Sequence, residues 1–144
     1  MSMERPASIR RFEQWYLAGI ALSLIGWAID WTWMQERLAA DPRTAGFGWM
    51  LGVMLVLNVA VSLLLWFLTA RRGSVVAKWI VVVLAGLSVA RLLVDLPALL
   101  EGAMSVVSFA VGAATTLVNV VAAVLLFRAD ARAWFGEDVT GEVE

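Results

Sequence analysis

The sequence predicts an all-α integral membrane protein, an antiparallel four-helix bundle with both termini in the cytoplasm. The first observation is composition: the 144 residues are 62% hydrophobic and 16% charged, whereas soluble domains are about 45–50% apolar and about 25% charged. The second is four long uncharged runs, at 14–29, 44–70, 79–90 and 102–127. The third is a one-sided distribution of Lys and Arg. A soluble domain of this length could not bury so many apolar side chains, so we expect them to face lipid.

Each uncharged run extends to a membrane span. The spans cover about 12–33, 47–70, 75–96 and 105–127, and each reaches the roughly 20 residues that a helix needs to cross a hydrocarbon core of about 30 Å. The runs do not alternate between polar and apolar residues, which argues against a transmembrane β-barrel. We therefore expect a single domain at 1–136, followed by an acidic, disordered tail at 137–144.

Residues that favour helix ends separate the spans. Gly73 is suited to the left-handed cap that ends the second span, and Ser74 to the N-cap of the third. Pro97 is expected to end or kink the third span, because proline lacks the N–H group that continues a helix. We expect the fourth span to continue as a helix through 134–135 and to end at Gly136.

The basic residues predict the orientation. Only Arg37 and Arg43 fall on the side opposite the termini, and this bias favours a multi-pass protein of a bacterial inner membrane with both termini in the cytoplasm. The first span is expected to be a retained anchor, because its apolar stretch exceeds the roughly 7–15 residues of a signal peptide. The basic residues on the terminal side are Arg5, Arg10, Arg11, Arg71, Arg72, Lys78, Arg128 and Arg132.

Missing residue types narrow the chemistry. The chain has no Cys and no His, which excludes disulfides, thiolate nucleophiles, and metal or haem ligation by thiolate or imidazole. The net charge of −1 offers no electrostatic basis for binding nucleic acid. We therefore expect a protein that is not an enzyme and that has no catalytic residues, metal site or cofactor.

Every span carries small or polar residues along one face. In the first span, Gly19, Ser23 and Gly26 follow at intervals of four and three, which places them on one side of a helix. Small residues let helices approach closely in lipid, and hydroxyl or amide groups can hydrogen bond between helices. We expect these faces to meet inside the bundle, although the GxxxG motif at 48–52 could instead form a homodimer face. The predicted packing residues are Gly19, Ser23, Gly26, Gly48, Gly52, Ser62, Ser88, Ser108, Gly112, Thr116 and Asn119.

Four polar residues are expected to cluster in the outer half of the bilayer, namely Asp30, Asn58, Arg91 and Asp95. Arg91 and Asn58 lie at nearly the same depth, about 20 Å from the basic ends of their helices. An unpaired Arg in hydrocarbon costs at least about 2.5–3.5 kcal/mol, so we expect Asp30 and Asp95 to pair with it. Two interpretations remain open: a structural polar lock, or a binding or permeation site that opens outward.

Two interfacial stretches resemble those of a broad group of small bacterial four-span membrane proteins of uncharacterised function. The stretch 71–79 is a basic hairpin followed by a Trp, and 125–135 is an amphipathic ending before a short polar tail. The resemblance covers about the last two-thirds of the chain. It implies a bacterial four-span protein, and it implies no catalytic residues.

Two functions compete on these grounds. The first is an accessory or assembly protein that acts through helix–helix contacts in the lipid bilayer, as a homo-oligomer or with another membrane protein. The second is a small oligomeric transporter or channel built on the polar cluster. If the cluster is a polar lock, Arg91→Ala should lower stability by about 3–5 kcal/mol, because two carboxylates would lose their partner.

Overall fold

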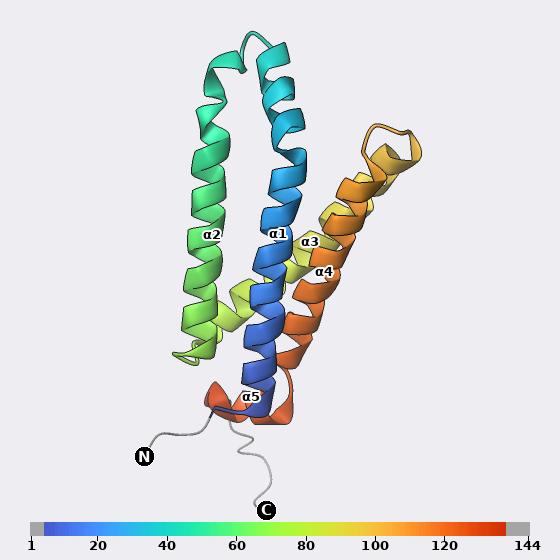
Figure 1. The fold of residues 1–144 in the computed structure, drawn as a ribbon. Coiled ribbons are helices and arrows are strands. Elements are labelled where there is room, and N and C mark those ends of the chain that lie inside the picture. The colour runs from blue at the N-terminus through green and yellow to red at the C-terminus, as the bar shows by residue number, and fades with distance from the viewer. Residues whose placement is uncertain (1–4, 138–144) are drawn as a thin grey trace, which may run out of the picture.

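A computed structural model describes residues 5–137. Its elements are α1 (Ala7–Ala40), a short 3-10 helix η1 (Ala45–Phe47), α2 (Trp49–Ala70), α3 (Val75–Leu100), α4 (Val106–Leu125) and α5 (Ala129–Trp134) (Figure 1). The four longest, α1 to α4, are long and apolar enough to cross a membrane. The prediction of an all-α bundle with four membrane-length helices is confirmed.

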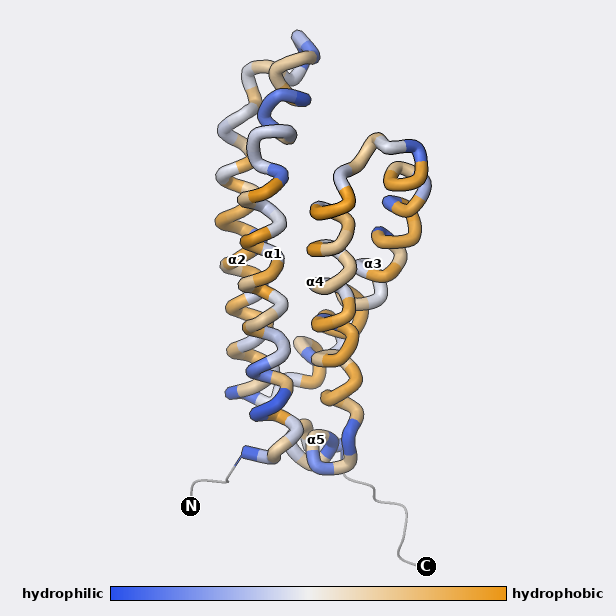
Figure 2. Tube along the Cα trace, turned by 45° about the vertical axis from the view of Figure 1, so that its right-hand side comes forward, coloured by the Kyte–Doolittle hydropathy of each residue, from blue (hydrophilic) through white to orange (hydrophobic). Residues whose placement is uncertain are grey.

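Apolar side chains cover the outside of these helices. Within the most apolar window of each of the four, only 6% to 22% of the residues are buried inside the molecule. Figure 2 shows hydrophobic residues along the middle of the helices and hydrophilic residues gathered at their ends. Exposed apolar surface of this extent requires lipid around it. The chain is a multi-pass membrane protein with four candidate spans.

The four helices form two hairpins that are joined through α1 and α4 and that separate between α2 and α3. The most extensive contact joins α1 to α4, α3 packs mainly on α4, and α2 and α3 touch each other less. The hairpin of α1 and α2 stays together along its length, whereas α3 leans away from α2 with distance from the α5 end (Figure 1). The bundle is therefore closed at the α5 end and open between α2 and α3 towards the opposite, loop end.

The apolar core lies at the closed end. It is built from the first turns of α1, the adjoining ends of α2, α3 and α4, and α5, which lies beneath them. The Trp134 indole N–H donates a hydrogen bond of 3.3 Å to the Thr69 carbonyl, which fixes α5 against the end of α2. The fully or nearly fully buried side chains include Ile9, Phe12, Ala70, Ala122, Leu126 and Ala131.

The predicted helix boundaries near the α2–α3 turn are confirmed. Gly73 has a φ of 58°, and the Ser74 hydroxyl accepts a hydrogen bond of 3.3 Å from the Ala77 N–H. Gly136 also has a positive φ, of 67°, after the last helix. Pro97 does not end α3, which continues to Leu100, because a proline in the last turn removes a single hydrogen bond.

The prediction for the end of the fourth span is wrong. The helix does not continue to 134–135; α4 ends at Leu125, and Arg128 takes an extended backbone with ψ of 153° before α5 begins. This break lets α5 turn under the bundle, where Ala131 and Phe135 are buried. Of the predicted acidic tail, residues 138–144 lie outside the described part of the chain.

Within the α1–α2 hairpin, α1 is longer than the bilayer core. With 34 residues, α1 measures about 51 Å at 1.5 Å per residue, against a core of about 30 Å. In Figure 1 this hairpin extends past the turn that joins α3 to α4. The Arg37 guanidinium lies 4.6 Å from the Trp33 ring near its tip, a contact typical of a water–membrane boundary.

Candidate functional site

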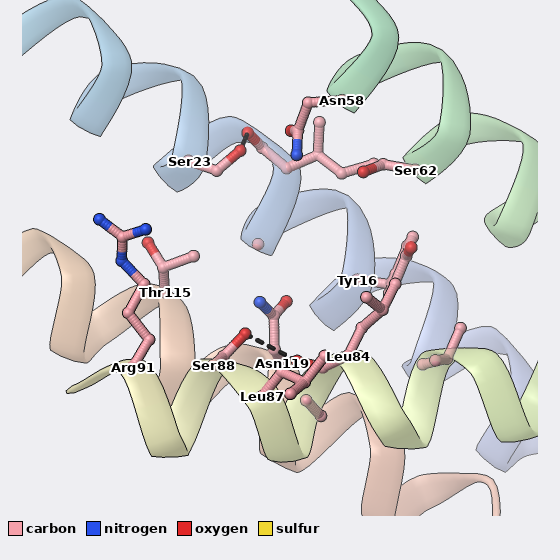
Figure 3. A pocket seen from close by; sticks show the side chains of 14 residues that line it. Tyr16, Ser23, Asn58, Ser62, Leu84, Leu87, Ser88, Arg91, Thr115 and Asn119 are labelled. Atoms are coloured by element: carbon pink, nitrogen blue, oxygen red, sulfur yellow. Dashed lines mark hydrogen bonds between the residues drawn. The ribbon is translucent and has the colours of Figure 1, made fainter. Parts of the chain in front are cut away.

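The open side of the bundle forms a polar cleft of about 340 Å³, which residues from all four long helices line. Its apolar walls come mainly from Ile20 on α1 and from Val81, Leu84 and Leu87 on α3. Figure 3 shows the polar side chains directed into this space. They are Tyr16 and Ser23 from α1, Asn58 and Ser62 from α2, Ser88 and Arg91 from α3, and Thr115 and Asn119 from α4.

Several cleft hydroxyls are occupied by their own helices. Ser23 donates to the Ile20 carbonyl at 2.9 Å, and Ser88 donates to the Leu84 carbonyl at 2.9 Å. Thr115 donates in the same way, to the carbonyl four residues earlier in α4. Such bonds satisfy a hydroxyl in an apolar environment without a second helix. These residues make the cleft polar but do not tie helices together.

The two cleft amides remain available. Within residues 5–137, neither the Asn58 nor the Asn119 side chain has a hydrogen-bond partner, and Asn58 is exposed. Asn119 is held by packing, because its Oδ1 atom lies against the backbone of Gly19. Asn58 therefore offers two donors and an acceptor to anything that enters the cleft, and Asn119 offers the two donors of its amino group.

Arg91 stands at one end of the cleft and is not enclosed. Its side chain is 80% exposed, and its single ion pair among the described residues joins Nε to Asp95 Oδ2 at 3.4 Å within α3. Figure 3 shows the guanidinium beside Thr115, directed away from the α3 axis. The expected polar lock around Arg91 is therefore not what the structure shows.

Asp30 lies apart from Arg91. Its Oδ1 atom accepts a hydrogen bond of 2.5 Å from the Ser108 hydroxyl in the first turn of α4, where the helix dipole also favours a carboxylate. It lines a second cavity of about 230 Å³ at the loop end, with Trp33 and Ser105 among the lining residues. The expected Asp30–Arg91 pair does not form, because α4 lies between α1 and α3.

The predicted packing residues divide into two groups. A Cβ on Gly19 would meet Asn119 Oδ1 at 2.5 Å, and one on Gly26 would meet Val111 Cγ1 at 3.5 Å, so both glycines serve the α1–α4 contact. The buried Thr116 contributes to the α3–α4 contact, since its hydroxyl lies 3.5 Å from the Ser88 carbonyl. Gly48, Gly52 and Gly112 have open space where a Cβ would lie, so they bring no helices together within this chain.

A second polar centre, which the sequence analysis missed, lies in the core at the α5 end. Lys78 is 1% exposed, and its Nζ atom bonds to Glu137 Oε2 at 2.5 Å. The same ammonium lies 4.7 Å from the Phe127 ring centroid and 5.1 Å from that of Phe135. Aromatic rings and a carboxylate together can hold a buried cation.

Two acidic residues join elements beside this centre. Glu13 on α1 pairs with Arg5 at 2.9 Å and with Arg71 at 3.4 Å. Asp130 on α5 accepts a hydrogen bond of 3.0 Å from the Ser8 backbone N–H at the start of α1. That bond to the charged form holds the pKa of Asp130 below its ordinary value. The closed end is thus tied together by charges as well as by packing.

The arrangement of the described residues is one that can bind a polar group. The hydroxyls of Ser23, Ser88 and Thr115 donate to carbonyls of their own helices, whereas the Asn58 amide and the Arg91 guanidinium reach the open side of the cleft. Fold and cleft together define a four-span membrane protein with a polar cleft open on one side. No known protein family, characterised protein or solved structure matches this chain. The resemblance seen in stretches 71–79 and 125–135 therefore brings no family assignment.

Proposed function

We propose that this chain is a non-enzymatic accessory protein of a bacterial inner membrane that acts by assembling with another membrane-spanning segment. One observation carries the proposal: α2 and α3 diverge inside the apolar part of the molecule and leave a polar cleft between them. A cleft of this kind is a surface on which a further helix can pack.

Energetics favour an occupied cleft. Asn58 and Arg91 are exposed side chains on helices that otherwise present apolar surface. A charged or amide side chain facing hydrocarbon costs free energy, about 2.5–3.5 kcal/mol for an Arg on insertion scales. Hydrogen bonds between helices recover about 0.6–2 kcal/mol each in membranes. An entering helix that offers donors and acceptors lowers this cost.

The orientation is part of the same proposal. Arg71, Arg72, Arg128 and Arg132 all lie near the closed end, in the α2–α3 turn and around α5. A concentration of basic residues next to spans marks the cytoplasmic side. With that side assigned, the cleft opens towards the outer half of the bilayer, and a partner would enter it there.

Site-directed cross-linking tests the proposal cleanly, because the chain has no Cys. A photoreactive benzophenone attached to Ser62→Cys, in the cleft, should give a discrete protein cross-link in native membranes. The control is Val56→Cys, which is on the same helix and 67% exposed but does not line the cleft. It should give no such product. Monomers and lipid adducts alone at both positions would contradict the proposal.

Transport is the second candidate. A volume of about 340 Å³ lies within the range of about 300–1,000 Å³ typical of small-molecule sites, and the exposed Arg91 could attract an anion. Liposomes containing the purified protein should then pass small anions such as chloride or phosphate, and Arg91→Ala should reduce the flux. If the unmodified protein shows no flux above that of empty liposomes, transport of these anions is ruled out.

A further inference from the structure

We infer that the segment entering the cleft is α3 of a second copy of this chain, joined through reciprocal Arg91–Asp95 contacts. The inference rests on the proposed function, because it names the partner for the same cleft. It assigns a role to the Arg91–Asp95 ion pair, which lies within α3 and does not join α3 to another helix of the same chain.

The pair is incomplete within one chain. Arg91 contacts Asp95 through Nε alone, at 3.4 Å, which leaves both terminal amino groups of the guanidinium without an ion-pair partner among the described residues. Asp95 has a side chain 28% exposed, and the contact engages only its Oδ2 atom. Each copy therefore offers two terminal amino groups of Arg91 and one carboxylate oxygen of Asp95. These groups lie one helical turn apart on the same face of α3.

In a two-fold symmetric dimer, Arg91 of each copy can pair with Asp95 of the other copy. Copies of a membrane protein share one orientation, so a two-fold axis along the membrane normal places equal residues at equal depth. Residues four apart on a helix differ in height by about 6 Å, which an Arg side chain can span. Each Arg91 can then reach the Asp95 carboxylate of the other copy, while its own Asp95 limits the repulsion between the two cations. Charge-assisted pairs of this kind are among the stronger hydrogen bonds.

The surroundings of the pair fit a helix of the same kind. Leu87 and Leu84 line the cleft one and two helical turns before Arg91 and are 58% and 42% exposed, so they offer apolar contact to a neighbouring α3. On the opposite wall, Asn58 and Ser62 of α2 present polar groups to whatever lies between. The α3 helix of a second copy would pack against both walls of the cleft, and the α3 helix of the first copy would pack in the same way in the cleft of the second.

Charge reversal tests the inference with cross-linking as the readout. Leu87→Cys places a thiol beside Arg91, and Leu93→Cys is the control, because it is on the opposite side of α3 and is 66% exposed. In membranes, Leu87→Cys should form a disulfide-linked dimer and Leu93→Cys should not. Adding either Arg91→Asp or Asp95→Arg should reduce this dimer at least about tenfold, because like charges then face each other.

Two combinations should restore the dimer. A chain carrying both Arg91→Asp and Asp95→Arg exchanges the charges and should cross-link with itself again. Differently tagged Arg91→Asp and Asp95→Arg chains, expressed together, should form the mixed dimer in preference to either homodimer. Because both side chains reach the surface, circular dichroism should show unchanged helix content in every variant, which separates loss of pairing from loss of folding.

Each other outcome has a distinct meaning. A Leu87→Cys dimer that is insensitive to charge reversal overturns the reciprocal contact and leaves assembly in place. A Ser62→Cys cross-link to a different protein, without a Leu87→Cys dimer, overturns the second copy as partner but supports the proposed function. Absence of any protein cross-link at both Ser62→Cys and Leu87→Cys overturns the inference and the proposed function together.

Discussion

The side-chain oxygen of Asn119 on α4 occupies the space in which a side chain at Gly19 on α1 would have to lie. A Cβ built on Gly19 would lie 2.5 Å from Oδ1 of Asn119 and 3.4 Å from Cγ1 of Val118. Real Cβ atoms do not approach neighbours at the first of these distances. Since α1 and α4 form the most extensive helix contact, Gly19 sets the separation of the pair that holds the two hairpins together.

Gly19→Ala should therefore destabilise the fold. The added methyl group forces Asn119 to move or α1 to shift from α4, and overpacking of this kind costs about 1–3 kcal/mol. Thermal unfolding followed by tryptophan fluorescence in detergent micelles measures the change. The matched control is Gly112→Ala in α4, where nothing lies within 4 Å of the new Cβ. Equal losses of stability for both variants would show that the effect of Gly19→Ala is not steric.

Two turns, one between α2 and α3 and one between α3 and α4, offer a second comparison of glycines. Gly73 and Gly102 have φ values of 58° and 72°, so alanine is strained at both positions. Only at Gly73 would the Cβ also meet the carbonyl oxygen of Trp134, at 2.8 Å. Gly73→Ala should therefore cost more stability than Gly102→Ala and should release α5 from the bundle. Proteolysis near residue 128 should become faster in the first variant alone.

The buried Lys78–Glu137 pair predicts a coupling that single substitutions cannot reveal. Removing one partner of such a pair leaves a buried charge and costs about 3–5 kcal/mol. Glu137→Gln leaves the buried Lys78 ammonium without its carboxylate. Because the Glu137 side chain is 32% exposed, solvent already screens the pair, and we expect a smaller loss of about 1–3 kcal/mol. Lys78→Met together with Glu137→Gln should recover part of that loss, since no charge is left without a partner. A double-mutant cycle of unfolding free energies measures the coupling; additive effects would contradict it.

Much of the fold follows from local signals in the sequence. The four spans could be predicted because lipid contact imposes uncharged runs of fixed minimum length, and the caps at Gly73 and Ser74 because each depends on one residue's own backbone or hydroxyl group. The break at Leu126–Arg128 could not be predicted in this way. It is stabilised by the burial of Ala131 and Phe135 against other helices, which no local pattern records.

The candidate site was predicted in part for a related reason. Counting residues along a helix gives the depth of each side chain in the membrane. This count placed Asn58 and Arg91 at nearly the same level, and both line one cleft. The depth of a residue does not show which helix packs beside it. Because α4 lies between α1 and α3, Asp30 on α1 bonds to Ser108 on α4 and not to Arg91 on α3. The burial of Lys78 was missed because it depends on Phe135 and Glu137, which reach it only through the position of α5.

Arg91→Ala should have little effect on the stability of a single chain. The earlier expectation of about 3–5 kcal/mol assumed a buried ion pair, but the Arg91 side chain is 80% exposed. An exposed pair four residues apart on a helix contributes about 0.2–0.5 kcal/mol. Unfolding of the dilute, detergent-solubilised monomer should therefore change by less than about 1 kcal/mol. A large loss under these conditions would place Arg91 inside the folded chain.

Acid should loosen the contact between α5 and α1 through Asp130. The Ser8 N–H hydrogen bond lowers the pKa of Asp130 below the ordinary Asp value of about 3.9. A carboxyl group with a lowered native pKa stabilises the fold fully above its unfolded pKa, and this contribution is lost as the pH falls through the native pKa. Hydrogen exchange at the Ser8 amide should accelerate relative to neighbouring amides below about pH 4. Asp130→Asn should show the faster exchange already at pH 7, whereas Asp41→Asn at the loop end should leave it unchanged. Equal protection of the Ser8 amide in the parent and in Asp130→Asn at pH 7 would show that the carboxylate charge contributes nothing to this contact.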